Sequence, residues 1–322
     1  MINQELKSVL KEIEQSNGLP NRNYTDNIQY NVEKELLIFG YGYTAKFVCA
    51  KFSRKNWQIY CTTRNSEKTK EIRDLKVTPI FFNDEEKIKN ILNDDAYILT
   101  TAPPENGKDP IIENYGHLLK KCRERIKWAG YLSTTSVYGD KKGEWVTEDT
   151  ELEPNLERSI SRVAAENSWI KLGENLLIKT VIFRLAGIYG PGRSLVDRMM
   201  KNEDVYIVDK PGHLFNRIHV DDIVGAIEMA ISSKSEATIF NLSDDLPATQ
   251  LDVAQFAASL LKKKCPQTVS LESDLVSEMA RSFYKEEKKV SNTRLKDELG
   301  YKLVFPSFKE GLFSIHKNSK EF

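Results

Sequence analysis

Three small residues near the start of the chain, Gly40, Gly42 and Ala45, have the spacing G-x-G-x-x-A in the stretch IFGYGYTAKF. An apolar run typical of a strand precedes them, and a run typical of a helix follows. Gly40 permits a tight turn, Gly42 lets backbone N–H groups approach an anion, and Ala45 allows close packing of the helix. Because a helix N-terminus favours negative charge, the stretch predicts a dinucleotide site that also includes Tyr43 and Thr44. The alternative is a turn-forming glycine pair without a ligand.

The second strand-like run ends in CTTRN, and this places Arg64 where a site for NAD usually carries an acidic residue. Guanidinium pairs with phosphate through two parallel hydrogen bonds, which suits the 2′-phosphate of NADP. We therefore expect NADP to be preferred over NAD. The alternative is an arginine that faces solvent from a loop.

The elements that must position these residues alternate between strand-like and helix-like runs. The strand-like runs are ELLIFG, QIYCTTR, VTPIFFN, DAYILTTAPP, GYLSTTSVYG, LLIKTVIFRLAGIYG and IFNLSDD. Parallel strands need crossovers of about a dozen residues or more, so this order predicts an α/β fold with a doubly wound parallel sheet of Rossmann type. Ligands bind outside the carboxyl ends of such strands, which adds Thr101 and Ala102 to the expected cofactor site.

The length of the chain, 322 residues, allows one large domain with a second lobe. We expect an N-terminal helix and linker over residues 1–33 and a dinucleotide-binding domain over residues 34–190. Residues 191–322 should form mainly a smaller C-terminal α/β substrate lobe. A part of this last segment, about residues 214–243, is expected to return to the Rossmann core.

The composition limits the partners that the protein can have. Lys and Arg together number 47, as do Asp and Glu, so no overall basic field favours nucleic acid or a membrane surface. No apolar run approaches the ~20 residues of a transmembrane helix. Cys49, Cys61, Cys122 and Cys265 form no C-x-x-C pair, and no histidine lies at metal-ligand spacing. We therefore expect reduced core thiols, no metal site and a cytoplasmic location.

Several later stretches form a recognisable set with GYGYTA. They are YLSTTSVYGD, FRLAGIYGPGR, NRIHVDDIVGAI, FNLSDDLPAT and VSNTRLKDELGYKLVFPSFKEGL. From about residue 34 to residue 312 the chain resembles an extended short-chain dehydrogenase/reductase of the NAD-dependent, nucleoside-diphosphate-sugar epimerase/dehydratase type. The resemblance implies oxidoreductase or isomerase chemistry with NADP or NAD on a small molecule, such as a nucleotide sugar or another anionic compound. It also implies a homodimer through helices that include residues 114–126 and 158–172.

The same resemblance implies roles for individual residues. Alignment on the V-Y-G turn gives Thr134 the catalytic hydroxyl, with Thr135 as the alternative. The family's Y-x-x-x-K motif is followed by a Glu, and here Glu166 keeps the frame while Arg158 replaces the Tyr and Arg162 the Lys. Arg162 can still bind ribose hydroxyls, but Arg158 cannot act as a general acid/base because guanidinium effectively never releases its proton. The chain resembles the atypical branch that lacks the active-site Tyr.

Two tyrosines are candidates for the missing acid/base group. Tyr138 in the V-Y-G turn and Tyr189 in GIYGPGR should lie near the cleft, where neighbouring arginines would favour a phenolate. The alternative is that each hydroxyl bonds to the backbone inside the core. Arg193 and Arg217 are expected to converge with Arg158 on an acidic substrate, beside Tyr189.

Three functions are compatible with these features. The first is an NAD(P)-dependent oxidoreductase or epimerase/dehydratase-like enzyme that uses another acid/base group. The second is a sensor or regulatory protein that binds NADP(H) without turning over a substrate, and the third is a non-redox enzyme built on the nucleotide fold. The complete-looking substrate lobe favours the first.

Overall fold

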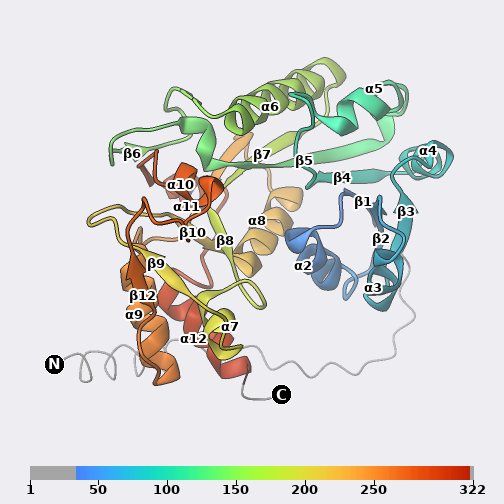
Figure 1. Ribbon diagram of the computed structural model, residues 1–322. Coiled ribbons are helices and arrows are strands. Elements are labelled where there is room, and N and C mark those ends of the chain that lie inside the picture. Colours follow the sequence, from blue (N-terminus) through green and yellow to red (C-terminus); the bar gives the residue numbers. More distant parts are fainter. Residues whose placement is uncertain (1–33, 320–322) are drawn as a thin grey trace. The chain divides into compact units, whose positions relative to one another are not determined.

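Seven parallel strands form the centre of residues 34–319, the part of the chain that the computed structural model describes (Figure 1). In spatial order they are β11 (Ile239–Leu242), β7 (Thr180–Leu185), β5 (Ile126–Thr134), β4 (Ala96–Thr100), β1 (Lys34–Phe39), β2 (Trp57–Thr63) and β3 (Thr78–Phe81). The order confirms the predicted doubly wound sheet of Rossmann type, and each strand-like run supplies one of its strands. The expected N-terminal helix and linker, residues 1–33, lie outside the described residues.

Helices cover both faces of this sheet (Figure 1). On one face lie α2 (Tyr43–Phe52), α3 (Lys68–Asp74) and α8 (Val220–Ser232), and on the other lie α4 (Glu85–Leu92), α5 (Pro110–Lys121) and α6 (Glu157–Leu176). Alternate strand residues point to opposite faces, so Leu36 and Ile38 of β1 join one core cluster, and Leu37 and Phe39 the other. The continuous apolar run of β1 is therefore explained by burial on both sides.

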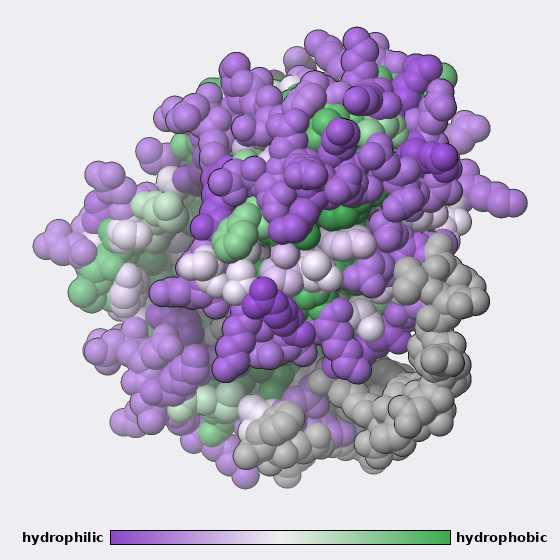
Figure 2. Space-filling model, turned by 90° about the vertical axis from the view of Figure 1, so that its right-hand side faces the viewer, coloured by the Kyte–Doolittle hydropathy of each residue, from purple (hydrophilic) through white to green (hydrophobic). Residues whose placement is uncertain are grey.

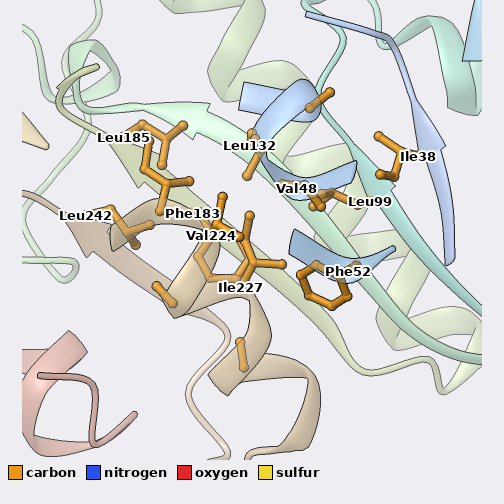
Figure 3. Close-up of a cluster of buried hydrophobic side chains, with 14 of the residues drawn as sticks. Ile38, Val48, Phe52, Leu99, Leu132, Phe183, Leu185, Val224, Ile227 and Leu242 are labelled. Carbon is orange, nitrogen blue, oxygen red and sulfur yellow. The ribbon is translucent and has the colours of Figure 1, made fainter. Parts of the chain in front are cut away.

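The cluster beneath α2 and α8 ties the start of the chain to its later part. Figure 3 shows Val48 and Phe52 of α2 and Ile227 of α8 gathered against the sheet residues Leu99 and Phe183. All five side chains are buried. Each such side chain contributes about 1.5–3 kcal/mol to stability relative to an exposed one, so this layer anchors α2 and with it the turn that precedes the helix.

The remaining elements, together called the small lobe, form smaller units beside the sheet. Three two-stranded parallel pairs join β8 (Gly187–Tyr189) to β10 (Arg217–His219), β9 (Tyr206–Val208) to β12 (Gln267–Val269), and β6 (Trp145–Val146) to β13 (Lys289–Val290). Helices α7 (Leu195–Met200), α9 (Gln250–Leu261) and α12 (Phe308–Asn318) pack together, and α10 (Glu278–Phe283) and α11 (Thr293–Asp297) flank β13. The 3₁₀ turns are η1 (Arg123–Arg125) and η2 (Thr135–Tyr138). While α8 and β11 return to the large sheet, β10 pairs outside it.

Polar side chains cover most of the face that Figure 2 shows, with small apolar areas between them. Within residues 34–319, no helix combines the length and apolar character needed to cross a membrane. Cys49, Cys61 and Cys122 are buried free thiols, in agreement with the expected core positions. Cys265 is also free but exposed, so the expectation of a core position is wrong for this thiol.

Candidate active site

The turn between β1 and α2 depends on Gly40. Its φ of +95° lies in a region that side-chain-bearing residues rarely adopt, and a Cβ there would stand 3.2 Å from Thr101 Oγ1 and 3.3 Å from the Ala102 nitrogen. Two hydrogen bonds fix the turn: the Gly40 N–H donates to Thr62 Oγ1 at 2.9 Å, and the Thr101 hydroxyl donates to the Gly40 carbonyl at 2.8 Å. The turn is thus held by the ends of β2 and β4.

Gly42, at the N-terminus of α2, faces open space. It is the N-cap residue, no side chain caps the helix there, and a Cβ on Gly42 would meet nothing within 4 Å. The N–H groups of a helix's first turn have no partner within the helix and carry partial positive charge. Ala45, one turn on, is fully buried against the sheet, as predicted for close helix packing. This cradle of backbone N–H groups fits a pyrophosphate.

A pocket of about 490 Å³ extends from this helix N-terminus to the small lobe. Its lining includes most of the predicted site residues: Gly42, Tyr43, Thr44, Thr101, Thr134, Arg158, Arg162 and Arg193. Seven others do not line it: Gly40, Ala45, Arg64, Ala102, Tyr138, Tyr189 and Arg217. Eight of the fifteen predicted residues therefore lie around one pocket, and the other seven lie outside its lining.

Thr134 ends β5 at the middle of the pocket. It caps η2, and its Oγ1 accepts a hydrogen bond from the Ser136 N–H at 3.3 Å. This bond uses the hydroxyl as an acceptor and leaves its proton available to a pocket molecule. Thr135 and Ser136 also line the pocket, and the Ser159 hydroxyl of α6 donates to Ser136 Oγ at 3.0 Å. The end of β5 therefore presents a group of hydroxyls to the pocket.

Arg162 is fixed on one side and open on the other. Its Nη1 donates to the Leu132 carbonyl at 2.8 Å and to the Tyr131 hydroxyl at 3.0 Å, and the guanidinium lies 5.7 Å from the Tyr131 ring centroid. A guanidinium has five N–H donors, so the remaining ones are available to a bound molecule. Arg162 thus presents donors beside Thr134, although it cannot release a proton.

Arg158 bridges the two parts of the pocket. From the first turn of α6, its Nη2 donates to Ser282 Oγ at 2.8 Å, and its guanidinium lies 4.9 Å from the ring centroid of Phe283, both in α10. Arg193, at the opposite end, lies 5.3 Å from the Tyr43 ring centroid. Both arginines are exposed and line the pocket, so each can bind an anionic group without breaking a buried ion pair.

The sequence of most of the sheet matches the model of a known family. A model of the NAD dependent epimerase/dehydratase family matches residues 36–243, more than half of the chain. The chain belongs to this family. It is 26% identical over 293 residues to protein YeeZ of Escherichia coli K12, covering 85% of this chain and 97% of that protein.

Two solved structures extend the comparison to most of the chain. A conserved protein of unknown function from Silicibacter pomeroyi is 34% identical with a TM-score of 0.81, covering 89% of this chain and 99% of that one. UDP-glucuronic acid 4-epimerase from Bacillus cereus, in complex with UDP-glucuronic acid and NAD, is 18% identical with a TM-score of 0.69. That alignment covers 88% of this chain and 99% of the epimerase, and it shows a shared fold.

Tyr138 lies beneath the pocket rather than in it. Its buried hydroxyl donates to Asn241 Oδ1 at 2.6 Å and accepts from Arg184 Nη1 at 3.0 Å. Arg184 also pairs with Glu166 at 2.9 Å, and Glu166 accepts a hydrogen bond from the Ser133 hydroxyl. Burial raises the Tyr138 pKa to about 12, outweighing the opposing effect of Arg184. The expected phenolate is therefore wrong, and Tyr138 belongs to a buried hydrogen-bond network.

Tyr189 and Arg217 also face away from the pocket. The Tyr189 hydroxyl donates to the Ser307 carbonyl at 3.2 Å, and burial raises its pKa well above the usual value. Arg217 is buried and donates to the Phe215 and Ala248 carbonyls at 3.0 and 2.9 Å. The expected convergence of Arg217 with Arg158 and Arg193 is therefore wrong.

Arg64 lies at the end of β2, outside the pocket lining. It pairs with Glu105 and packs 4.4 Å from the ring centroid of Phe82. About half of each charged side chain is exposed, 54% for Arg64 and 47% for Glu105. Such an exposed pair contributes little to stability, so Arg64 can leave Glu105 for another anionic partner at a small cost in free energy.

Sequence reasoning missed the part of the pocket contributed by the segment around α10 and β13. Ser282, Phe283, Glu286 and Lys288 all line the pocket, together with Asn216 before β10. The first four fall in the run RSFYKEEKKV, which has the composition of a solvated charge cluster. Residues 285–289 are all charged, so the run has no periodicity that would have indicated an inward-facing pair.

Proposed function

We propose that the protein is an NAD(P)-dependent enzyme of the epimerase/dehydratase type that acts on a nucleotide-linked sugar or a related anionic compound. The observation that carries the proposal is a single pocket that runs from the α2 N-terminus to the small lobe. Thr134 and Arg162 line its middle, and Arg158 and Arg193 add positive charge. The family and the fold shared with UDP-glucuronic acid 4-epimerase support it.

The residues that would hold the cofactor are those of the glycine turn and the sheet edge beside it. The backbone at Gly42, Tyr43 and Thr44 would bind the pyrophosphate, and Arg162 would bind ribose hydroxyls. When bound, the cofactor would supply hydride transfer to or from the substrate. Thr134 would donate a hydrogen bond to a substrate oxygen, and its position at the end of β5 supports this role.

We further propose that NADP is preferred to NAD. Arg64 stands at the end of β2, and its exposed pair with Glu105 leaves the guanidinium free to turn toward a 2′-phosphate. Glu105 competes with that phosphate for Arg64, so the preference should be modest. A homodimer through α5 and α6 is a further prediction.

The alternative function is a sensor or regulatory protein that binds NADP(H) without turnover. The observation that favours it is the contact of Arg158 with Ser282, at the position that our alignment assigns to the family's acid/base Tyr. Against it, the small lobe forms one wall of the pocket and contributes charged groups to it.

One experiment tests both functions. Nicotinamide fluorescence should detect binding of NADPH and NADH to the purified protein, and failure to bind either contradicts the proposed enzyme and the sensor. UDP-glucose and UDP-glucuronic acid with NADP or NAD would then be followed by chromatography and by absorbance of the reduced cofactor. Product formation supports the enzyme. Cofactor binding without any product, across a panel extended to ketones and aldehydes, supports the sensor.

A further inference from the structure

A buried ion pair lies in the wall of the pocket that the small lobe contributes. Lys288 Nζ donates to Glu286 Oε2 at 2.9 Å, and the two side chains are only 8% and 7% exposed. Lys288 Nζ also donates to the carbonyl of Gly139, at the end of η2, at 2.5 Å. Both residues line the pocket. The pair thus connects the segment before β13 to the turn that carries Ser136.

Neither member of this pair is saturated by the described residues. An ammonium has three donors, and the two hydrogen bonds of Lys288 use two of them. Glu286 Oε1 is buried without a hydrogen-bond partner in the described part of the chain. A buried carboxylate oxygen without a partner is costly, so a molecule that fills the pocket with hydroxyl groups would satisfy it.

We propose that Lys288 is the acid/base group of the reaction and that Glu286 positions it, in place of the Tyr that Arg158 replaces. The inference rests on the proposed enzymatic function. Lys288 Nζ gives a proton to, or takes one from, the substrate oxygen that changes between hydroxyl and carbonyl. The free oxygen of Glu286 accepts a hydrogen bond from a neighbouring substrate hydroxyl.

The other ionisable residues of the pocket lining cannot take this part. Arg158, Arg162 and Arg193 effectively never release a proton. Tyr43 donates its hydroxyl to the Pro191 carbonyl at 3.1 Å, and burial raises its pKa. Lys288 differs because burial, the largest influence, lowers its pKa from the usual value toward the range in which a base works.

The charges around Lys288 shift its pKa in opposite directions. Glu286, from the same segment, and Asp140, from the turn after η2, favour the ammonium. Lys141, next to Asp140, opposes it. Asn216 fixes the backbone, because its Nδ2 donates to the Lys288 carbonyl at 2.7 Å and its Oδ1 accepts from the Val290 N–H at 2.8 Å. The amine is therefore held in one place with a charge partner.

In the reduction of a carbonyl, the ammonium of Lys288 acts as the acid. Hydride from a dihydronicotinamide reaches the carbonyl carbon, the C=O π electrons move to oxygen, and the oxygen takes a proton from Lys288 Nζ. The N–H bond pair stays on nitrogen, and the neutral amine recovers a proton from water. In the oxidative direction, the neutral amine accepts the hydroxyl proton as the hydride leaves carbon.

Three variants test the proposal through turnover, and a fourth serves as their control. With UDP-glucose and UDP-glucuronic acid as probes, Lys288→Met and Lys288→Arg should each lower kcat by about 10²–10⁴-fold, the usual contribution of general acid/base catalysis. Lys288→Arg keeps the charge but cannot release a proton, so retention of wild-type kcat by this variant overturns the proposal. Glu286→Gln removes a charge that favours the ammonium, so the limb of the pH profile that reports Lys288 should move to lower pH. For oxidation of these probes, which uses the neutral amine, this is the acidic limb. An unmoved profile contradicts the positioning role.

Lys289→Met is the matched control. Lys289 follows Lys288 in the chain, but its ammonium lies 5.5 Å from the Trp145 ring centroid and it does not line the pocket. This variant should keep kcat and NADPH affinity within about twofold. A loss equal to that of Lys288→Met would show that the effect comes from the fold around β13, and would overturn the assignment.

A second measurement does not depend on turnover. Only the neutral amine reacts with acetic anhydride, so labelling of each lysine from about pH 6 to about pH 10, read by peptide mass spectrometry, reports its titration. Lys288 should reach half-maximal labelling at lower pH than Lys289, at still lower pH in Glu286→Gln, and should be protected by NAD with UDP-glucuronic acid. The proposal is overturned, even when no probe is turned over, by either of two results. Lys288 is labelled over the same pH range as Lys289, or its labelling is unchanged by NAD with UDP-glucuronic acid. Lack of NADPH and NADH binding contradicts the proposed function instead.

Discussion

The two ends of the pocket are built on different principles. At the end where we propose that the cofactor binds, the groups that face the pocket belong mainly to the backbone, positioned by Gly40, Gly42 and the N-terminus of α2. At the other end, side chains from α6, η2 and the segment before β13 do the work, among them Arg158 and Lys288. A backbone site keeps its function as long as the turn keeps its shape. A side-chain site can change its chemistry through one or two substitutions while the fold remains.

The largest expected effect is the loss of the backbone site in Gly40→Val. A β-branched residue is strained at a φ of +95°, and its Cβ would press on Thr101 Oγ1 and on the Ala102 nitrogen. The turn must then shift, and we expect affinity for NADPH and NADH to fall by about 100-fold or more, equivalent to about 2.7 kcal/mol. Titration by nicotinamide fluorescence measures it.

Gly107→Val controls for backbone strain alone. Gly107 has a φ of +77°, a Cβ there would meet nothing within 4 Å, and it lies outside the pocket lining. This variant should lose some thermal stability and keep cofactor affinity. Equal affinity losses in both variants would show that strain, rather than the shape of the cofactor turn, decides binding.

The same contrast explains what could be predicted from the sequence. The seven strands and the glycine turn follow from local patterns, because strand periodicity and positive-φ glycines depend on neighbouring residues. Side-chain direction in the small lobe depends on contacts with distant residues. Asn216 lines the pocket while Arg217 donates to the Ala248 carbonyl in the interior. Ile188 lines the pocket while the Tyr189 hydroxyl donates to the Ser307 carbonyl.

Burial and long-range contacts explain the remaining differences between the predicted and the observed pocket residues. Nearby arginines favour the phenolate form of a tyrosine only where burial removes little of its hydration. Tyr138 is fully buried beside Arg184, so burial dominates its pKa. No local pattern predicts that Glu286 and Lys288 enter the pocket, since their position is set by the pairing of β13 with β6 and by the hydrogen bonds of Asn216. Such long-range contacts are invisible to motif reading.

At the side-chain end of the pocket, Arg158→Ala should weaken binding of the substrate rather than binding of the cofactor. Removal of one charge-assisted hydrogen bond costs about 1.5–3 kcal/mol, so the KM or Kd for UDP-glucuronic acid should rise about tenfold or more. NADPH affinity should stay unchanged, because the cofactor turn is elsewhere. Arg198→Ala is the control, since Arg198 forms an exposed pair with Glu203 and does not line the pocket. A parallel loss of NADPH affinity in Arg158→Ala would contradict the separation of the two ends.

Arg64→Ala tests a side chain at the cofactor end. The variant should bind NADPH about three- to tenfold more weakly and NADH almost as before, because only the first carries a 2′-phosphate. The exposed position and the competing Glu105 keep this effect small. Arg73→Ala, at the exposed end of α3, is the control. An equal effect on both cofactors would refute the contact with the 2′-phosphate.

The last variant should leave ligand binding unchanged and alter only stability, which separates Arg217 from the site. Burial raises the pKa of Asp244 to about 8 despite the nearby charge of Arg217, so the folded state holds a proton that the unfolded chain releases near its ordinary pKa of 3.8. The free energy of unfolding should therefore fall as pH rises from about 4 to about 8, by at most about 1.4 kcal/mol per pH unit from this group. Asp244→Asn should flatten this slope in urea unfolding between about pH 5 and about pH 7.5. Since neither Arg217 nor Asp244 lines the pocket, Asp244→Asn should preserve affinity for NADPH and UDP-glucuronic acid. A loss of affinity with an unaltered slope would return Arg217 to the substrate site.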